Sequence, residues 1–162
     1  MSKTRKLYYL DTSALAKLYL TEPGSRKLAK WFGRRVHGFH PSVELWVSRL
    51  GFPEAVSAIV RRRNAGALNP DAARRLWREV FNDFYLPQTP YAIIDPVLPV
   101  VHHAAFLVVG HGLRGYDAVH LATALRLQNT LALGRQVTFV SADKRLTQAA
   151  QAERLTAVDP TV

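Results

Sequence analysis

Acidic residues are scarce in this chain, and four of them fall where predicted strands give way to predicted helices. The sequence has 22 Lys and Arg residues against 12 Asp and Glu residues. Asp11 ends a short apolar run, Asp143 closely follows another, and Asp117 opens a long apolar helical stretch. Glu54 lies in the first turns of the helix predicted after a third apolar run. Each could serve only as a helix N-cap or as a first-turn acid that the helix dipole favours, so a shared site depends on where the surrounding elements bring them.

The elements around these acids predict that all four carboxylates meet at one edge of a sheet. Short apolar runs bounded by polar residues are typical of buried strands in a parallel sheet, and here they alternate with stretches of helical period, which predicts an α/β fold built from βαβ units. The carboxyl ends of parallel strands share one edge with the starts of the helices that follow them. The predicted strands cover about residues 7–11, 43–48, 91–94, 137–140 and 155–158, and the predicted helices about residues 13–20, 25–35, 50–64, 71–86, 97–109, 116–132 and 143–153.

A cluster of carboxylates repels itself, and this repulsion indicates what the site binds. Without a cation, some members would have raised pKa values and would bind protons. An all-oxygen ligand set in a chain without cysteine suits Mg²⁺ or Mn²⁺, and such an ion polarises a phosphoryl oxygen. The formal net charge of +10 favours polyanions, nucleic acid first among them. The residues therefore predict nuclease chemistry, with Asp11 and Asp117 as the principal metal ligands.

Four motifs around these acids resemble those of the PIN domain family, in particular the VapC-like ribonuclease toxins of toxin–antitoxin pairs. They are LDTSAL at residues 10–15, SRLGFPE at 48–54, LRGYDAVHLATA at 113–124 and FVSADKRL at 139–146. The resemblance covers nearly the whole chain, and the third motif is the most specific. One departure is Pro53 directly before Glu54, which the first turn of a helix tolerates.

The resemblance implies a fold, an activity and partners. The fold would be a PIN-like three-layer arrangement, in which helices flank a central, mostly parallel sheet of four to five strands within a single domain over residues 1–162. The activity would be Mg²⁺- or Mn²⁺-dependent cleavage of RNA by Asp11, Glu54, Asp117 and Asp143. The implied partners are an RNA substrate, a cognate antitoxin and a second copy of the chain in a homodimer.

Composition and motif content exclude several other classes of protein. The absence of cysteine excludes disulfides and thiolate metal sites. No apolar stretch approaches the roughly 18 residues of a membrane span, and the basic N-terminus lacks the apolar region of a signal peptide. We therefore expect a soluble cytoplasmic protein. No glycine-rich phosphate loop is present either.

Two other functions stay open on the sequence alone. The chain could be a non-catalytic RNA-binding or regulatory module with the same fold, although the presence of all four acids argues against this. It could also be a phosphohydrolase with Asp11 as a covalent nucleophile. Such enzymes usually carry a second acid two residues later, and that position is Ser13 here.

Three polar residues near the predicted site are given other roles. His120 follows Asp117 by three residues on the same predicted helix and could approach the acids, but a core or interface histidine is the favoured interpretation. Asp95 is interpreted as a strand terminator and cap. Glu44 begins its strand and therefore lies at the opposite edge of the sheet.

Two predicted helices carry more bulky apolar residues than outer helices of a small domain need. We expect them to form a groove for an amphipathic segment of the antitoxin, which would place a blocking arginine among the four acids. The alternative is that these residues are ordinary buried core. The residues concerned are Leu28, Trp31, Phe32, Trp77, Phe81 and Phe84.

Overall fold

The computed structural model describes residues 5–33, 39–132 and 134–162. Its centre is a five-stranded sheet in the order β3-β2-β1-β4-β5, with every pairing parallel. This confirms the predicted α/β class and the parallel sheet. The strands are β1 (Lys6–Leu10), β2 (Val43–Ser48), β3 (Tyr91–Ile94), β4 (Val137–Val140) and β5 (Thr156–Val158).

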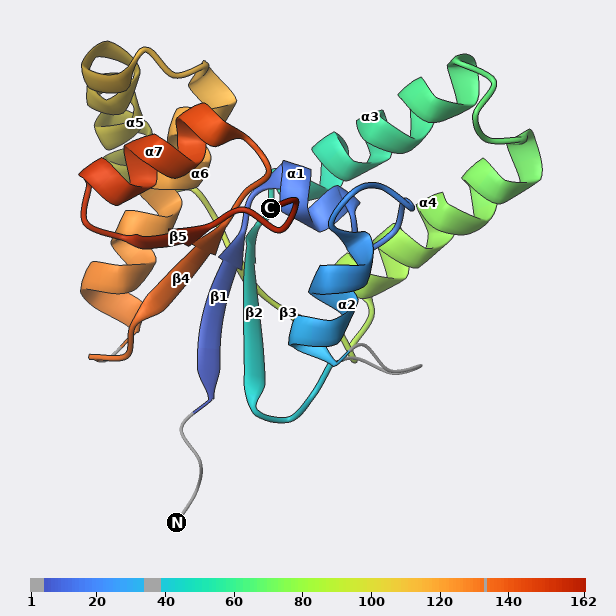
Figure 1. Cartoon of the computed structure of the whole chain (residues 1–162), viewed down its shortest axis with the longest axis horizontal. Helices are drawn as coiled ribbons and strands as arrows, with labels where there is room; N and C mark the ends of the chain where they lie inside the picture. Colours follow the sequence, from blue (N-terminus) through green and yellow to red (C-terminus); the bar gives the residue numbers. More distant parts are fainter. Residues whose placement is uncertain (1–4, 34–38, 133) are drawn as a thin grey trace.

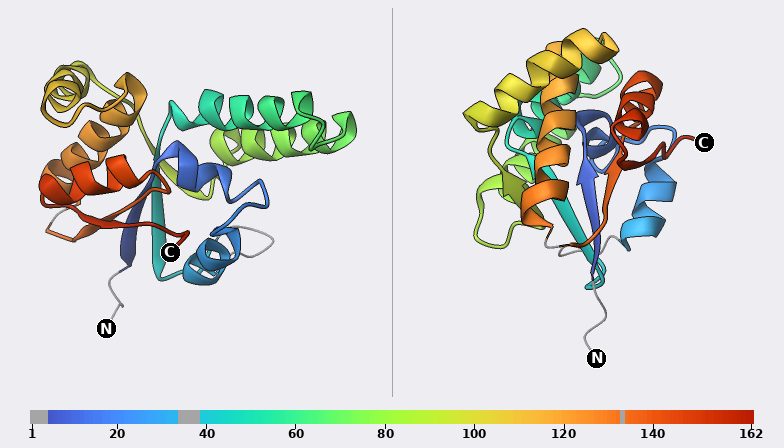
Figure 2. Two further views of the ribbon diagram at one scale, coloured as in Figure 1. Left: turned by 45° about the horizontal axis from the view of Figure 1, so that its top comes forward. Right: turned by 90° about the vertical axis from the view of Figure 1, so that its left-hand side faces the viewer.

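Helices cover both faces of the sheet and complete the three predicted layers (Figure 1). Helices α1 to α4 contribute to one buried cluster and α5 to α7 to the other. Helices α3 and α4 run side by side and extend away from the sheet as an arm (Figure 2). The helices are α1 (Thr12–Ala16), α2 (Ser25–Phe32), α3 (Gly51–Asn64), α4 (Pro70–Tyr85), α5 (Leu98–His111), α6 (Gly115–Arg126) and α7 (Lys144–Ala152).

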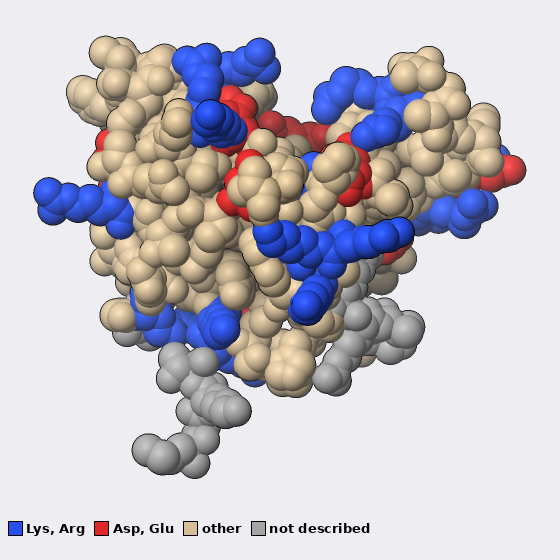
Figure 3. Space-filling model, viewed as in Figure 1, with Lys and Arg blue, Asp and Glu red and all other residues tan. Residues whose placement is uncertain are grey.

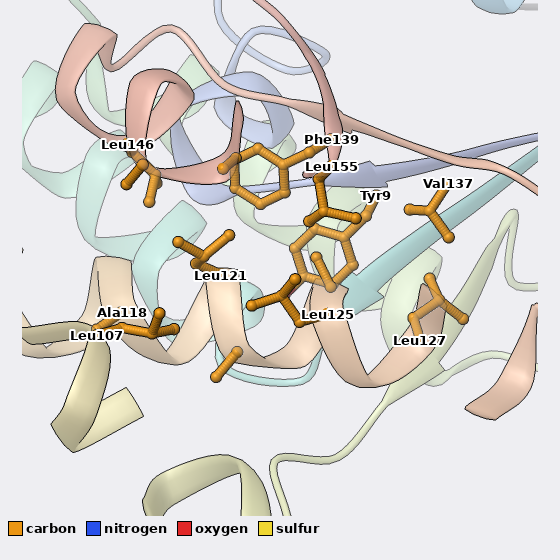
Figure 4. Close-up of a cluster of buried hydrophobic side chains, with 14 of the residues drawn as sticks. Tyr9, Leu107, Ala118, Leu121, Leu125, Leu127, Val137, Phe139, Leu146 and Leu155 are labelled. Atoms are coloured by element: carbon orange, nitrogen blue, oxygen red, sulfur yellow. The ribbon is translucent and has the colours of Figure 1, made fainter. Parts of the chain in front are cut away.

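Strand β1 supplies side chains to both buried clusters, because successive residues of a strand face opposite sides. Leu7 and Tyr9 pack under α6 and α7, whereas Leu10 packs on the α1 side. The ring of Tyr9 is fully buried and stacks on Phe139 of β4 with centroids 5.7 Å apart. Figure 4 shows both rings among leucines of the α6 side. Tyr9 is therefore held firmly within the core.

Several helices end earlier than the sequence pattern predicts. The first continues past Ala16 only as turns, and the second ends at Phe32 because Gly33 adopts the left-handed conformation of a C-cap (φ 57°). The basic pair at residues 34–35 lies outside the described residues. Helix α6 ends at Arg126 and passes into a π-helical turn, Leu127–Leu131.

One part of the predicted partner groove is wrong. Leu28 and Phe32 of α2 are fully buried, and Phe84 of α4 is nearly so, so these residues belong to the core. Trp77 and Phe81 of α4 do remain exposed, by 44% and 40%. Trp31 of α2 also stays partly exposed, so the surface that remains for a partner consists of Trp31 and of Trp77 and Phe81 on the arm formed by α3 and α4.

In the part of the chain that the structure describes, no helix is both long and apolar enough to cross a membrane.

Candidate active site

The candidate site lies where the strand order reverses beside β1. The chain passes from β1 to β2 and β3 on one side, and then continues to β4 and β5 on the other. In open α/β sheets this reversal opens a crevice at the carboxyl ends of the two strands. Asp11 follows β1 directly, and its backbone N–H donates to the carbonyl of Val140, the last residue of β4. Asp11 and Asp143 therefore stand on the two sides of this crevice.

Asp11 is buried and surrounded by donors. Its Oδ1 accepts the backbone N–H of Ala14 at 2.8 Å, which makes Asp11 the N-cap of α1. The hydroxyl of Ser13 lies 2.8 and 2.9 Å from its two oxygens, and that of Ser141 donates to Oδ2 at 2.7 Å. Burial nevertheless raises the pKa of Asp11, and these hydrogen bonds only partly oppose the shift. The carboxylate is held in place by these hydrogen bonds, in buried surroundings that disfavour its charged form.

Glu54 projects from the first turn of α3 and meets residues from two other elements. Its Oε2 accepts hydrogen bonds from Thr12 and from Nε2 of His120, the latter at 2.7 Å. His120 is buried on α6, and its Nδ1 lies 3.0 Å from the hydroxyl of Tyr9. Burial opposes the ionisation of Glu54, but the hydrogen bonds from His120 and Thr12 outweigh it and lower its pKa.

Asp117 and Asp143 are the more accessible pair of carboxylates. Asp117 is half-buried in the first turn of α6, and Asp143 is the exposed N-cap of α7, where Oδ1 accepts the backbone N–H groups of Arg145 and Leu146. Burial raises the pKa of Asp117, and the negative charges of Asp143 and Glu54 raise it further. Asp117 is therefore close enough to Asp143 and Glu54 to be repelled by both.

Acidic residues cluster on the surface at the candidate site, and basic residues surround them. Figure 3 shows Asp and Glu atoms in the hollow between the α5–α7 side and the α3–α4 arm, with Lys and Arg on both rims. Such an arrangement suits a polyanion whose scissile phosphate must approach carboxylates through a bound cation.

The donor set fits a hard divalent cation chemically, because it consists of carboxylate and hydroxyl oxygens with repulsion that a cation would relieve. Among the described residues, however, no three Asp, Glu or His side chains already stand at metal-binding distances. Binding an ion here therefore requires the more accessible carboxylates to rotate toward one another.

The structure adds polar residues that the sequence interpretation did not assign to the site. Ser13 and Ser141 hold Asp11, while Thr12, His120 and Tyr9 form the surroundings of Glu54. His120 is buried, as the favoured interpretation predicted, and its ring also contacts Glu54, so it does approach the candidate acids. A hydroxyl residue beside each acid at a strand end was the available signal for Thr12, Ser13 and Ser141.

Glu44 lies at the opposite edge of the sheet, as predicted, whereas Asp95 terminates β3 but does not cap the next helix, whose N-cap is Val97. Glu44 accepts a hydrogen bond from Arg135 at 2.7 Å near the start of β2, and this bond lowers its pKa. Asp95 follows β3 and pairs with Arg49 at the surface. Both carboxylates are neutralised by their own arginine.

Comparison with known proteins gives one family throughout. A model of the PIN domain matches residues 8–152. Ribonuclease VapC49 of Mycobacterium tuberculosis is 36% identical over 123 residues, which cover 74% of this chain and 75% of that protein. Ribonuclease VapC35 of the same species is 30% identical over 159 residues, which cover 95% of this chain and 97% of that protein.

Solved structures share the fold at low sequence identity. PAE2754 from Pyrobaculum aerophilum superposes with a TM-score of 0.61 at 20% identity, covering 96% of this chain and 90% of its own. FitAcB from Neisseria gonorrhoeae gives a TM-score of 0.60 at 18% identity, covering 95% and 98%. A DNA-bound VapBC from Salmonella typhimurium gives a TM-score of 0.56 at 13% identity, and the match covers 96% of this chain and 98% of that chain.

Proposed function

Because the chain belongs to the PIN domain family, we propose that it is a ribonuclease, the toxin of a toxin–antitoxin pair, and that it works with a divalent metal ion. The observation that carries this proposal is the convergence of the acids, since Glu54 accepts a hydrogen bond from Thr12, the residue after the buried Asp11, and the charges of Asp143 and Glu54 both reach Asp117. A bound cation would relieve the repulsion that raises the pKa of Asp117. The ribonuclease names of the relatives supply the substrate class.

In this proposal the four carboxylates hold Mg²⁺ or Mn²⁺ at the crevice between β1 and β4. The ion supplies Lewis-acid polarisation of the scissile phosphodiester. Ser13 and Ser141 keep the carboxylate of Asp11 in one orientation. Arg114 lies near enough to Asp117 to lower its pKa, so it is placed to contact a flanking phosphate.

The test is cleavage of a labelled RNA with Mg²⁺ or Mn²⁺, with excess chelator, and with Asp117→Asn. We expect chelator to abolish cleavage and Asp117→Asn to reduce it by more than about 100-fold, since a first ligand should matter at least as much as the residues that orient it. A protein that binds RNA but never cleaves it would be the non-catalytic module instead. A phosphoryl-aspartate at Asp11 would indicate the phosphohydrolase.

We propose that the antitoxin binds the arm formed by α3 and α4. Trp77, Phe81 and Tyr85 of α4 are exposed and form an aromatic cluster with Phe52 of α3. A hollow beside Trp77 is lined by apolar residues of both helices together with Arg63 and Arg74. These features suit an amphipathic helix laid into a groove, which could then place an arginine among the carboxylates.

The homodimer is also part of the proposal, and α5 offers its surface. Phe106 and Val109 are 76% and 86% exposed, and Leu98 is 66% exposed on the same helix. The neighbouring hollow between α5 and α6 is lined almost wholly by apolar side chains, among them Val108 and Tyr116. Exposed apolar surface of this extent is typical of a contact between copies of a chain.

A further inference from the structure

His120 is a buried polar residue whose ring joins two elements that the sequence keeps far apart. Its exposed fraction is 2%. Nε2 lies 2.7 Å from Oε2 of Glu54 and 3.0 Å from the hydroxyl of Thr12, and Nδ1 lies 3.0 Å from the hydroxyl of Tyr9. Both ring nitrogens are thus engaged, and Glu54 is reached from within the core.

The direction of these hydrogen bonds follows from the chemistry of the partners. A carboxylate can only accept, so the hydrogen must be on Nε2 when it bonds to Glu54. In a neutral ring Nδ1 is then an acceptor, and the hydroxyl of Tyr9 must donate to it. Tyr9 thereby selects the tautomer that presents a donor to Glu54, in the way that an outer hydrogen bond fixes the tautomer of a metal-site histidine.

We infer that Tyr9 and His120 are positioning residues that fix the carboxylate of Glu54 for the metal ion. This inference rests on the proposed function. Both described contacts of Glu54 fall on Oε2, and among the described residues Oε1 has no hydrogen-bond partner. We call the hydrogen-bonded series Tyr9–His120–Glu54 the relay. It uses Oε2 of Glu54 for orientation and leaves Oε1 for the ion.

The location of His120 explains why the orientation of Glu54 matters for an ion that residues of several elements would hold. His120 follows Asp117 by three residues on α6, so the two side chains lie on the same side of one helix. Glu54 comes from α3, which packs in the opposite layer. The bond from His120 thus sets the position of Glu54 relative to the helix that carries Asp117. Without it, a flexible glutamate would have to be ordered during ion binding.

Tyr9 is suited to anchor the relay because the core prevents its ring from moving. It stacks on Phe139, and strand pairing holds its backbone between β2 and β4. Loss of its hydroxyl would leave Nδ1 without its donor, so that the contact with Glu54 alone would favour the hydrogen on Nε2. The effect of Tyr9 can therefore reach the carboxylate through the ring of His120.

The experiment measures Mn²⁺ binding by calorimetry, together with kcat and KM for RNA cleavage, in wild type and four variants. His120→Leu removes the donor, and His120→Gln restores a side-chain N–H. Tyr9→Phe removes only the hydroxyl. Tyr8→Phe is the matched control, because Tyr8 is the adjacent residue of β1 and faces the opposite side of the sheet, against Phe32.

We expect His120→Leu to weaken Mn²⁺ binding by about 10–100-fold, the usual loss when an orienting partner of a ligand is removed, and to lower kcat with little change in KM for RNA. Tyr9→Phe should shift both quantities in the same direction by a smaller factor, and His120→Gln should recover part of the loss. Tyr8→Phe should match wild type.

Two results separate failure of the inference from failure of the proposed function. If wild type binds Mn²⁺ and cleaves RNA, but Tyr9→Phe and His120→Leu do so equally well, the relay has no positioning role. If wild type neither binds Mn²⁺ nor cleaves, the metal-dependent ribonuclease itself is refuted. Should His120→Leu fail to fold, Tyr9→Phe still decides, since Phe preserves the core ring.

Discussion

At the scale of the residue, Asp11 caps a helix and still has hydrogen-bonding capacity left for the proposed role of site carboxylate. The sequence placed it correctly at the end of a strand and the start of a helix, and it does cap α1. Capping uses only part of its hydrogen-bonding capacity, and the remainder is taken by Ser13 and Ser141. The serine after β4 could not be assigned from the sequence, because its contact spans 130 positions and depends on the pairing of β1 with β4.

The same scale carries a prediction about pH and stability. The folded-state pKa of Asp117 is raised by burial and by Asp143, so the native state holds this proton more tightly than the unfolded chain does. The contribution of the Asp117 carboxyl to stability is therefore fully present below its pKa in the unfolded chain, about 4. It is lost as pH rises from there through the pKa of the folded state. Without metal, Asp117→Asn should unfold at higher denaturant concentration than wild type at pH 7, and the difference should vanish near pH 3.

Glu54 has a lowered pKa, with the opposite dependence on pH, and the difference between wild type and Asp117→Asn cancels its contribution. At pH 7, a divalent ion should make wild type more stable than Asp117→Asn, which is the reverse of the order expected without metal. Wild type should gain about 1.4 kcal/mol when Mn²⁺ is ten times its Kd, and the variant should gain less. A variant less stable than wild type at pH 7 without metal would show that Asp117 is not under repulsion.

At the scale of the element, the distance between α3 and α1 determines where Glu54 is placed. It packs on α1 through Gly51, where an added Cβ would lie 2.9 Å from Cδ2 of the fully buried Leu15. Gly51→Ala should therefore cost about 1–3 kcal/mol of stability through overpacking. It should also lower cleavage, since Glu54 follows one turn later.

Gly110 supplies the matched control for that substitution. It lies within α5, and an added Cβ would meet nothing within 4 Å. Gly110→Ala should thus raise the free energy of unfolding by about 0.5–1 kcal/mol with cleavage unchanged. Urea unfolding and RNA cleavage of both variants measure the contrast. Equal stability of the two would show that α3 has room to move on α1.

Element types were predictable from the sequence, but their partners were less so. The alternation of apolar runs with helical stretches predicted the parallel sheet and its two helical layers, because burial on both faces leaves that pattern in every strand. The spacing of apolar residues could not show that the apolar face of α2 packs on the rest of the domain. Leu28 and Phe32 were therefore wrongly assigned to a surface for a partner. Nor could it show that His120 meets Glu54, since that contact joins helices of opposite layers.

At the scale of the whole molecule, the two proposed protein partners use separate surfaces. The antitoxin surface lies on the α3–α4 arm and the surface for a second copy on α5 (Figures 1 and 2). Trp77→Glu should abolish co-purification with the antitoxin and leave self-association unchanged. Val109→Glu should have the reverse effect, as light scattering after gel filtration would detect. Loss of both interactions in either variant would contradict two independent surfaces.

The net charge of +10 leads to a prediction about RNA affinity. Binding of RNA by Asp117→Asn, in which we expect cleavage to be strongly reduced, should weaken as salt rises, with a log–log slope of about −0.7 for each phosphate contacted in a single strand. In that background, Arg114→Gln should make the slope shallower by about 0.7, because Arg114 lies beside the carboxylates. Arg74→Gln is the control, since Arg74 is already paired with Asp71 on the arm, and it should leave the slope unchanged. A slope near zero would remove polyanion attraction as the reason for the basic surface, whereas equal effects of the two arginines would place the RNA path away from the crevice.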